Sequence, residues 1–283
     1  MEEIPSGPLT LSGYLARPLR SDGEVLRAPR PAVVICHGLP AAPGGAATAG
    51  RSYRVLADRL ASEMGWSALV LNYRGCGASG GDFSLLGWVE DVRAAVDHVA
   101  GRTNTTGVWV AGFGTGGAVA LRAAADSPTV RGVVSVGAPV DFGEWAANAD
   151  RLLRHSRDTG VVRSDSFPAN PRAWRDQFAG FSTTEAADRL APRPLMVVHG
   201  SDDELVPSLD ARAIADAHGA ADLRIIASGG HRLRYDPRCI SLVLGWLDRH
   251  GHDTAAMSAL SADPVPAGGP EALPTAEGSA PPA

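Results

Sequence analysis

Residues 107–126, GVWVAGFGTGGAVALRAAAD, carry the most informative pattern in this chain. The apolar run at 107–111 predicts a buried strand, and the alanine-rich run at 115–126 predicts a helix. Glycines at 112, 114, 116 and 117 crowd the few positions around this junction. Glycine adopts positive φ and allows close backbone contact, so a sharp strand-to-helix turn is predicted here, too crowded for most side chains.

The same alternation of strand and helix continues on both sides of this turn. Predicted strands lie at 9–16, 32–36, 67–72, 130–136, 195–199 and 223–227, and predicted helices at 53–64, 87–100, 208–218 and 239–250. Strands that alternate with helices require crossover connections. The sequence therefore predicts an α/β fold with a mostly parallel central sheet and helices on both faces.

Two segments depart from this alternation. Residues 142–193 contain helical patterns around 145–155 and 172–178 but no convincing strand, which predicts a short helical cap inserted at about 142–193. Residues 253–283 are rich in Ala, Pro, Gly and Ser without apolar periodicity, so this tail is predicted to be disordered. The remaining residues, 1–252 with the cap inserted, form one predicted domain, which is long enough for a sizeable core.

Composition excludes several classes of protein. A net charge of −5 gives no basic footprint for nucleic acid or for an anionic membrane surface. No apolar run approaches the ~20 residues of a membrane span, and the acidic N-terminus lacks a signal-peptide pattern. The chain has no lysine, which excludes Schiff-base chemistry and a P-loop. We therefore predict a cytoplasmic protein with no nucleic-acid or membrane partner.

Cysteine and histidine spacing gives no sign of a metal site. The three cysteines, at 36, 76 and 239, are far apart and form no C-x-x-C pair. No His, Asp or Glu cluster has ligand spacing. His37 and His199 each precede a glycine at a strand end and are predicted to make backbone hydrogen bonds. No metal and no cofactor are expected.

Three further motifs accompany the glycine-rich turn. His37-Gly38-Leu39-Pro40 follows a predicted strand directly, and residues 72–80 read NYRGCGASG. Residues 199–207 read HGSDDELVP, and His231 comes after the next predicted strand. An acid after a late strand, followed by a histidine after the next strand, is the order in which one large class of hydrolases places its acid and base.

Together these motifs resemble the α/β-hydrolase superfamily, in its esterase, dienelactone-hydrolase and serine-aminopeptidase-like branch. The resemblance covers roughly 9–250 and implies that Asp203 orients His231 as the general base; Asp202 matches the acid position less well. It also implies that the amides of Leu39 and Thr115 form the oxyanion hole. Where the superfamily's G-x-S-x-G turn has its serine, this sequence has Gly114.

A glycine at position 114 leaves three interpretations open. The protein is a non-catalytic relative that binds a small acyl or apolar ligand or a protein partner. Alternatively, Asp203 and His231 act without a covalent nucleophile, on a water or on a substrate proton. In the third interpretation a nearby Thr115, Cys76 or Ser79 replaces the serine.

The expected function is hydrolase-like action on a small ester, lactone or peptide-like carbonyl, impaired or water-mediated. The alternative is a binding pseudoenzyme. A small-molecule substrate or ligand is expected, and a homodimer is left open.

Glycines 112, 114 and 117 also match the dinucleotide pattern G-x-G-x-x-G, as do glycines 75, 77 and 80. Two matches among 33 glycines show how easily this pattern arises. A dinucleotide site also needs an acid at the end of the next strand to hold the ribose, and the residues that end it, 136–139, are VGAP. Dinucleotide binding is therefore the weaker explanation.

Overall fold

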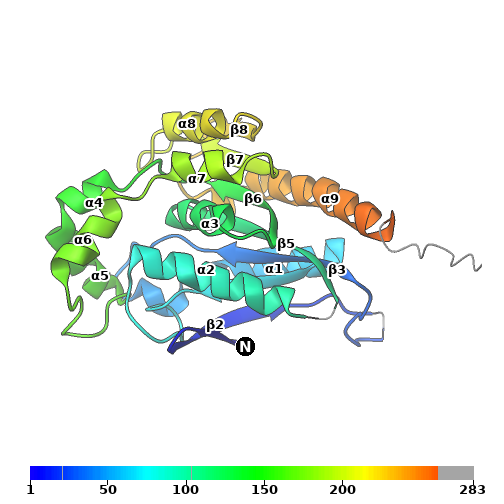
Figure 1. The fold of residues 1–283 in the computed structure, drawn as a ribbon, viewed down its shortest axis with the longest axis horizontal. Helices are drawn as coiled ribbons and strands as arrows, with labels where there is room; N and C mark the ends of the chain where they lie inside the picture. The colour runs from blue at the N-terminus through cyan, green and yellow to red at the C-terminus, as the bar shows by residue number, and fades with distance from the viewer. Residues whose placement is uncertain (21, 103, 261–283) are drawn as a thin grey trace, which may run out of the picture.

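The computed structural model describes residues 1–20, 22–102 and 104–260, and these residues form an eight-stranded sheet flanked by helices (Figure 1). The strands are β1 (Glu2–Ser6), β2 (Leu9–Ala16), β3 (Arg30–Cys36), β4 (Ser67–Asn72), β5 (Thr105–Phe113), β6 (Val130–Val136), β7 (Leu195–Gly200) and β8 (Asp222–Ile226). Their order across the sheet is β1-β2-β4-β3-β5-β6-β7-β8. From β4 to β8 all neighbours are parallel, whereas β2 is antiparallel to both β1 and β4. The predicted fold class is confirmed.

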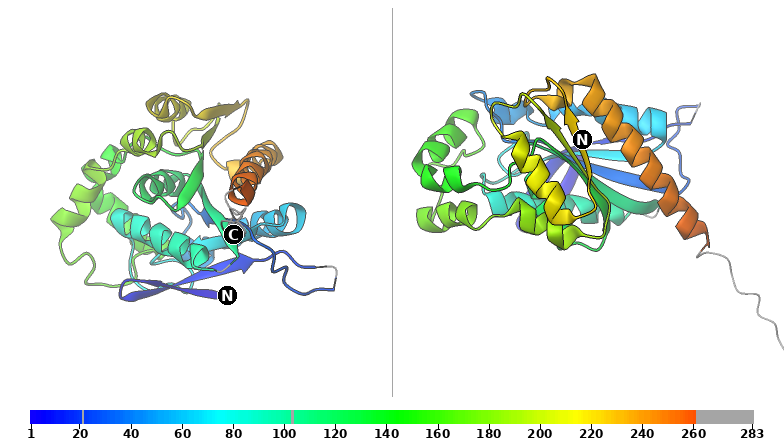
Figure 2. Two further views of the ribbon diagram at one scale, coloured as in Figure 1. Left: turned by 45° about the vertical axis from the view of Figure 1, so that its right-hand side comes forward. Right: turned by 90° about the horizontal axis from the view of Figure 1, so that it is seen from above.

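Helices cover both faces of the sheet. They are α1 (Arg54–Met64), α2 (Leu85–Ala100), α3 (Thr115–Ala125), α8 (Ser208–His218) and α9 (Pro237–Leu260). In the left panel of Figure 2, α2 and α3 lie on one side of the sheet, and α1 and α9 lie on the other. One buried cluster joins α2, α3 and α8 to the sheet, and a second joins α1 and α9 to the opposite face.

The central strand β3 shows why these residues form a buried strand. Val34 faces the cluster under α2 and α3, whereas Val33 and Ile35 face the cluster under α1 and α9. All three side chains are fully buried. A parallel strand covered by helices on both faces needs apolar residues at every position, not at alternate ones.

The sequence reasoning missed β1. This edge strand has five residues, two of them acidic, and only Ile4 supplies a large buried apolar side chain. Its pairing with β2, not its own pattern, defines it. Pro5 fits such a strand because an edge position does not require every backbone N–H in the ladder.

Four helices connect β6 to β7, across the segment predicted as a cap. They are α4 (Gly143–Ala147), α5 (Ala149–Thr159), α6 (Pro171–Ala179) and α7 (Thr183–Leu190). In Figure 1, α4, α5 and α6 project beyond one end of the sheet. Trp174 anchors α6 because its indole N–H donates to the Phe83 carbonyl oxygen at 3.0 Å. Helix α7 contacts α3 and α8 instead. The division into a domain and a cap stays a prediction.

Helix α9 extends beyond the predicted end at residue 250. It continues to Leu260, so residues 253–260 of the predicted disordered tail lie in a helix. Alanines at 255 and 256 favour helix, and the first proline after Pro237 is Pro264. The rest of that tail, 261–283, lies outside the described residues. In the part of the chain that the structure describes, no helix combines the length and the apolar character needed to cross a membrane.

Candidate active site

The turn from β5 to α3 is built from backbone contacts that exclude side chains. A Cβ on Gly112 would lie 2.2 Å from the Gly116 carbonyl oxygen, and a Cβ on Gly116 would lie 2.4 Å from that of His37. Gly114 has φ 56° and ψ −128°, a conformation that side chains other than glycine's adopt only under strain. The glycine-rich turn predicted from the sequence is present.

Asp203 lies in the loop after β7 and holds His231, which follows β8. His231 Nδ1 is 2.9 Å from Asp203 Oδ2. The other carboxylate oxygen accepts the backbone N–H groups of Leu205 and Val206, each at 2.9 Å. The Asp203 side chain is fully buried, whereas 29% of the His231 side chain is exposed. By contrast, Asp202 accepts from the Ser201 hydroxyl on the exposed side of the loop.

The charge state of Asp203 follows from these contacts. Burial by itself raises the pKa of this carboxyl. The hydrogen bonds from the Val206 amide, His231 and the Leu205 amide outweigh burial and lower the pKa below its ordinary value. Asp203 is therefore an ionised acceptor at neutral pH, and an ionised acceptor keeps the proton of the facing imidazole on Nδ1.

Gly114 directly faces this imidazole. A Cβ built on Gly114 would lie 3.6 Å from His231 Nε2 and 3.8 Å from Cε1, at ordinary van der Waals distance. Gly137, with φ 60°, borders the other side, because its Cβ would lie 3.8 Å from Asp203 Oδ2. The structure thus brings Gly114, Asp203 and His231 together from three loops at one edge of the sheet.

The two predicted oxyanion-hole amides belong to segments that touch each other. A Cβ on Gly38 would lie 3.0 Å from the Phe113 carbonyl oxygen and 3.8 Å from the Thr115 nitrogen. Leu39 follows Gly38, and Thr115 is the first residue of α3, where the helix dipole favours negative charge. The roles of Leu39 and Thr115 stay predictions.

His37 and the loop at 72–80 serve the framework of the site. His37 Nδ1 lies 2.8 Å from the Gly38 carbonyl oxygen, and burial lowers the pKa of His37 to about 4, so this ring is neutral. In the loop, Arg74 donates to the buried Asp91 of α2 at 2.9 Å. Burial raises the pKa of the Cys76 thiol, and the Ser79 hydroxyl donates to the Asn72 carbonyl oxygen. Cys76 and Ser79 are therefore poorly suited to replace a serine nucleophile.

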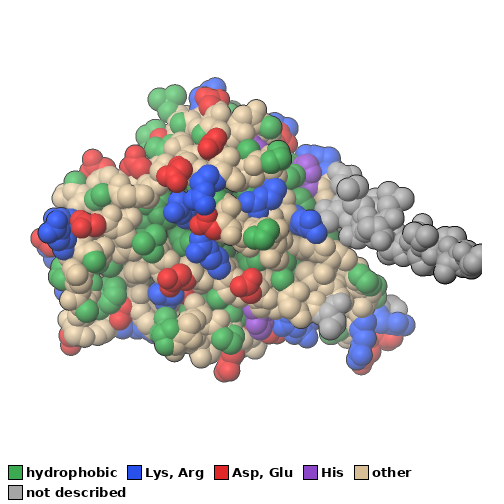
Figure 3. All heavy atoms as spheres, in the orientation of Figure 1, with side chains coloured by type: hydrophobic (Ala, Val, Ile, Leu, Met, Phe, Trp, Pro, Cys, Tyr) green, Lys and Arg blue, Asp and Glu red, His purple; other side chains and the backbone are tan. Residues whose placement is uncertain are grey.

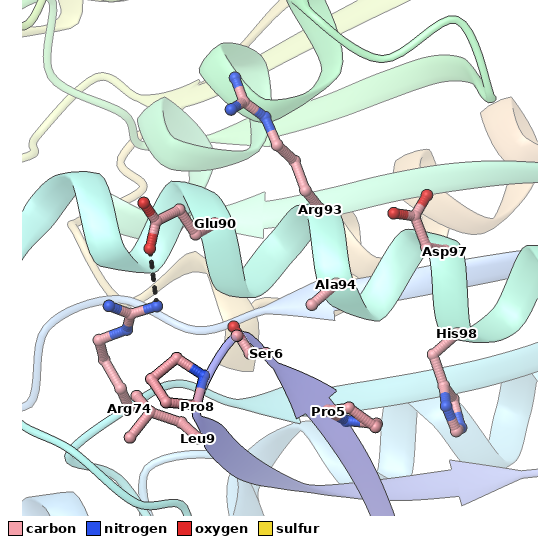
Figure 4. A pocket seen from close by; sticks show the side chains of 11 residues that line it. Pro5, Ser6, Pro8, Leu9, Arg74, Glu90, Arg93, Ala94, Asp97 and His98 are labelled. Carbon is pink, nitrogen blue, oxygen red and sulfur yellow. Dashed lines mark hydrogen bonds and ion pairs between the residues drawn. The ribbon is translucent and has the colours of Figure 1, made fainter.

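A groove of about 720 Å³ lies elsewhere, between the turn that joins β1 to β2 and helix α2 (Figure 4). Two of its arginines already have acidic partners: Arg74 contacts Glu90 at 3.0 Å, and Arg93 contacts Asp126. None of Gly114, Asp203 and His231 lines it. The groove is therefore not the candidate site. On the face shown in Figure 3, acidic and basic side chains lie interspersed. Among the described residues, no three His, Cys, Asp or Glu side chains could hold a metal ion.

Solved structures share this architecture over almost the whole chain. GrgF from Penicillium sp. sh18, an α/β hydrolase, superposes with a TM-score of 0.68 at 20% identity, over 89% of this chain and 98% of that one. Est1E from Butyrivibrio proteoclasticus, with ferulic acid bound, gives 0.66 at 20% identity, over 90% of this chain and 100% of that one. The chain has the α/β-hydrolase fold. At 20% identity, these two likenesses show the fold of the chain.

Sequence comparisons agree with the fold. Residues 27–164 match the family model described as serine aminopeptidase, S33. A 2-hydroxymuconate semialdehyde hydrolase from Pseudomonas sp. (strain CF600) is 33% identical over 94 residues, 32% of this chain. The matched stretch spans 31% of that relative's length. This chain is therefore similar in sequence to a hydrolase as well as in fold.

His199 lies beside Asp203, a contact that the sequence does not predict. The predicted backbone hydrogen bond is present, because His199 Nε2 lies 3.0 Å from the Val206 carbonyl oxygen. The same nitrogen also lies 3.3 Å from Asp203 Oδ2. No spacing in the sequence signals this contact, because His199 lies on a strand and Asp203 in the loop that follows it.

Proposed function

We propose that this protein carries out hydrolase-like action on a small ester, lactone or peptide-like carbonyl without a serine nucleophile. One observation carries the proposal: an imidazole oriented by a buried carboxylate directs Nε2 to within 3.6 Å of where a Gly114 side chain would begin. A base held in this way removes a proton from a group placed at that position. Because Gly114 supplies no hydroxyl, that group is a water molecule.

The proposed reaction is direct hydrolysis. The water oxygen attacks the carbonyl carbon while one of its protons passes to His231 Nε2. The carbonyl π electrons move onto the oxygen, and the amides of Leu39 and Thr115 stabilise this oxyanion. When the tetrahedral intermediate collapses, the bond to the leaving group breaks, and His231 returns the proton to the leaving oxygen or nitrogen. Asp203 stays ionised throughout and stabilises the imidazolium.

The comparisons support a hydrolytic reaction without defining its substrate. The curated relative is named as a hydrolase of 2-hydroxymuconate semialdehyde, and the matching family model is described as a serine aminopeptidase. One name belongs to a family and the other to a protein that matches 32% of this chain. Both names describe the hydrolysis of a substrate, and only this general reaction is proposed for the present chain.

A second candidate function, binding without turnover, rests on Gly114 itself. In a well-studied serine protease, removal of the nucleophile costs about 10⁶ in kcat and leaves only about 10³–10⁴ over water. If nothing replaces the lost hydroxyl, the site binds a small acyl or apolar ligand or a protein partner as a pseudoenzyme. The pair of Asp203 and His231 then merely joins the two loops.

Turnover of short-chain p-nitrophenyl esters separates the two functions. Under the hydrolytic proposal, His231→Ala lowers the rate by about 10²–10⁴, the usual contribution of a general base. His98→Ala is the matched control, because His98 lies on α2 and contacts Glu2, away from Gly114. A wild-type rate equal to that of His231→Ala would leave binding as the function. A fluorophosphonate probe is expected to label neither protein.

A further inference from the structure

A second histidine, His199 at the end of β7, contacts the carboxylate of Asp203. Its side chain is fully buried. Its Nε2 lies 3.0 Å from the Val206 carbonyl oxygen and 3.3 Å from Asp203 Oδ2. Both neighbours are acceptors, so the ring proton belongs on Nε2. In the described part of the chain His199 Nδ1 has no hydrogen-bond partner, which agrees with an unprotonated Nδ1.

His199 is linked to the Asp203 carboxylate through Val206. Asp203 Oδ1 accepts two backbone N–H groups, and Oδ2 faces both His231 Nδ1 and His199 Nε2. Asp203 Oδ1 thus has two donors and Oδ2 has one, while the single Nε2 proton of His199 goes to the Val206 carbonyl oxygen. Val206 connects the two residues, because its N–H donates to Asp203 Oδ1 and its carbonyl oxygen accepts from His199. The plane of the carboxylate is thereby fixed.

The placement of His199 on a strand gives this contact its importance. β7 is hydrogen-bonded to β6 on one side and to β8 on the other, whereas Asp203 stands in the loop that follows it. Side chains on regular elements hold a site more accurately than side chains on loops. His199 therefore connects the loop acid to the rigid sheet.

We propose that His199 is a positioning residue: by donating from Nε2 to the Val206 carbonyl oxygen, it holds the residue whose N–H fixes the Asp203 carboxylate, and so helps to orient His231 toward Gly114. The effect on rate rests on the function proposed above, whereas the hydrogen bonds do not. If His199 served only as core filling, any side chain of similar size would replace it. If it positions Asp203, a replacement must keep a donor at the place of Nε2.

The first test needs no substitution and no activity. Nitrogen-15 NMR of the wild-type protein with labelled histidine reports which ring nitrogen of each histidine carries the proton. The expected result is a proton on Nε2 of His199, together with a strongly deshielded Nδ1 proton on His231. A proton on Nδ1 of His199 would overturn the proposal, because Nε2 would then have nothing to donate.

The second test compares two variants of similar size. His199→Phe fills the space without a donor, whereas His199→Gln places an amide nitrogen the same number of bonds from Cβ as Nε2. The expected result is a shifted or broadened His231 Nδ1 proton signal in His199→Phe and a nearly native signal in His199→Gln. Native signals in both variants would show that His199 is core filling only. If His199→Phe does not fold, the tautomer measurement still decides.

Kinetics in a Gly114→Ser background supply an independent readout. His199→Phe is expected to lower kcat about tenfold with KM unchanged, far less than the ~10⁴ lost when a triad acid is disabled, because three donors to Asp203 remain. His199→Gln is expected to restore most of that loss. Equal kcat for the two variants would count against positioning. An inactive Gly114→Ser protein would count against the proposed function alone, because the NMR result for His199 would stand.

Discussion

Substitution of Gly114 tests the backbone geometry and the chemistry of the site separately. The residue has φ 56° and ψ −128°. A residue with a Cβ held in such a sparsely populated conformation costs about 1–3 kcal/mol. The added Cβ itself would meet no atom closer than 3.6 Å, so no steric clash adds to this cost. Gly114→Ala is therefore expected to lower the free energy of unfolding by about 1–3 kcal/mol.

For a chain of this size the loss corresponds to a fall in Tm of roughly 2–4 °C per kcal/mol, or about 2–12 °C. Gly114→Ser carries the same backbone cost and adds a hydroxyl. Its Oγ lies one C–O bond beyond a Cβ that is 3.6 Å from His231 Nε2, within reach of a hydrogen bond. We expect this variant to gain esterase activity at least ~10²-fold over the wild type, against the ~10⁶ that a complete nucleophile contributes elsewhere.

Calorimetry and urea unfolding measure the first effect, and p-nitrophenyl ester turnover with fluorophosphonate labelling measures the second. Gly114→Ala is the matched control, since it has the strain without the hydroxyl. If both variants are as stable as the wild type, the strain argument is wrong. If folded Gly114→Ser is neither active nor labelled, Nε2 does not face position 114 as the distances require.

Three further predictions concern the framework. Gly116→Ala is expected to lower the free energy of unfolding by more than ~3 kcal/mol, because its Cβ would lie 2.4 Å from a carbonyl oxygen. Gly245→Ala in α9 is expected to raise the free energy of unfolding by ~0.5–1 kcal/mol, and urea titration compares the two variants. The lowered pKa of Asp203 contributes stability that is present above its unfolded value of 3.8 and lost as pH falls through the folded value, so the wild-type advantage over Asp203→Asn should shrink in acid unfolding curves below about pH 4. Burial raises the pKa of Cys36 and Cys239 to about 12 and also raises that of Cys76, so a disulfide thiol reagent should react with all three only after denaturation; rapid reaction in the native state would contradict their burial.

Much of the fold followed from local patterns. Apolar runs such as 67–72 and 130–136 coincide with β4 and β6 because a buried parallel strand is apolar at every position. Local patterns do not predict β1 and α7, because both are short and polar and are stabilised by partners distant in the chain. The sequence predicts the end of α9 ten residues too early, because Ala and Ser at 255–259 are typical both of a disordered tail and of a helix.

The order of motifs along the chain was enough to name Gly114, Asp203 and His231 as candidates, because parallel strands bring their carboxyl ends to one edge of the sheet. Only the tertiary structure could show that Gly114 directly faces His231 Nε2 and that His199 lies beside the Asp203 carboxylate, hydrogen-bonded to Val206. Those contacts depend on loop conformations and side-chain directions, which no pattern within one segment determines. They are set by packing between segments that, for Gly114 and His231, lie more than a hundred residues apart in the chain.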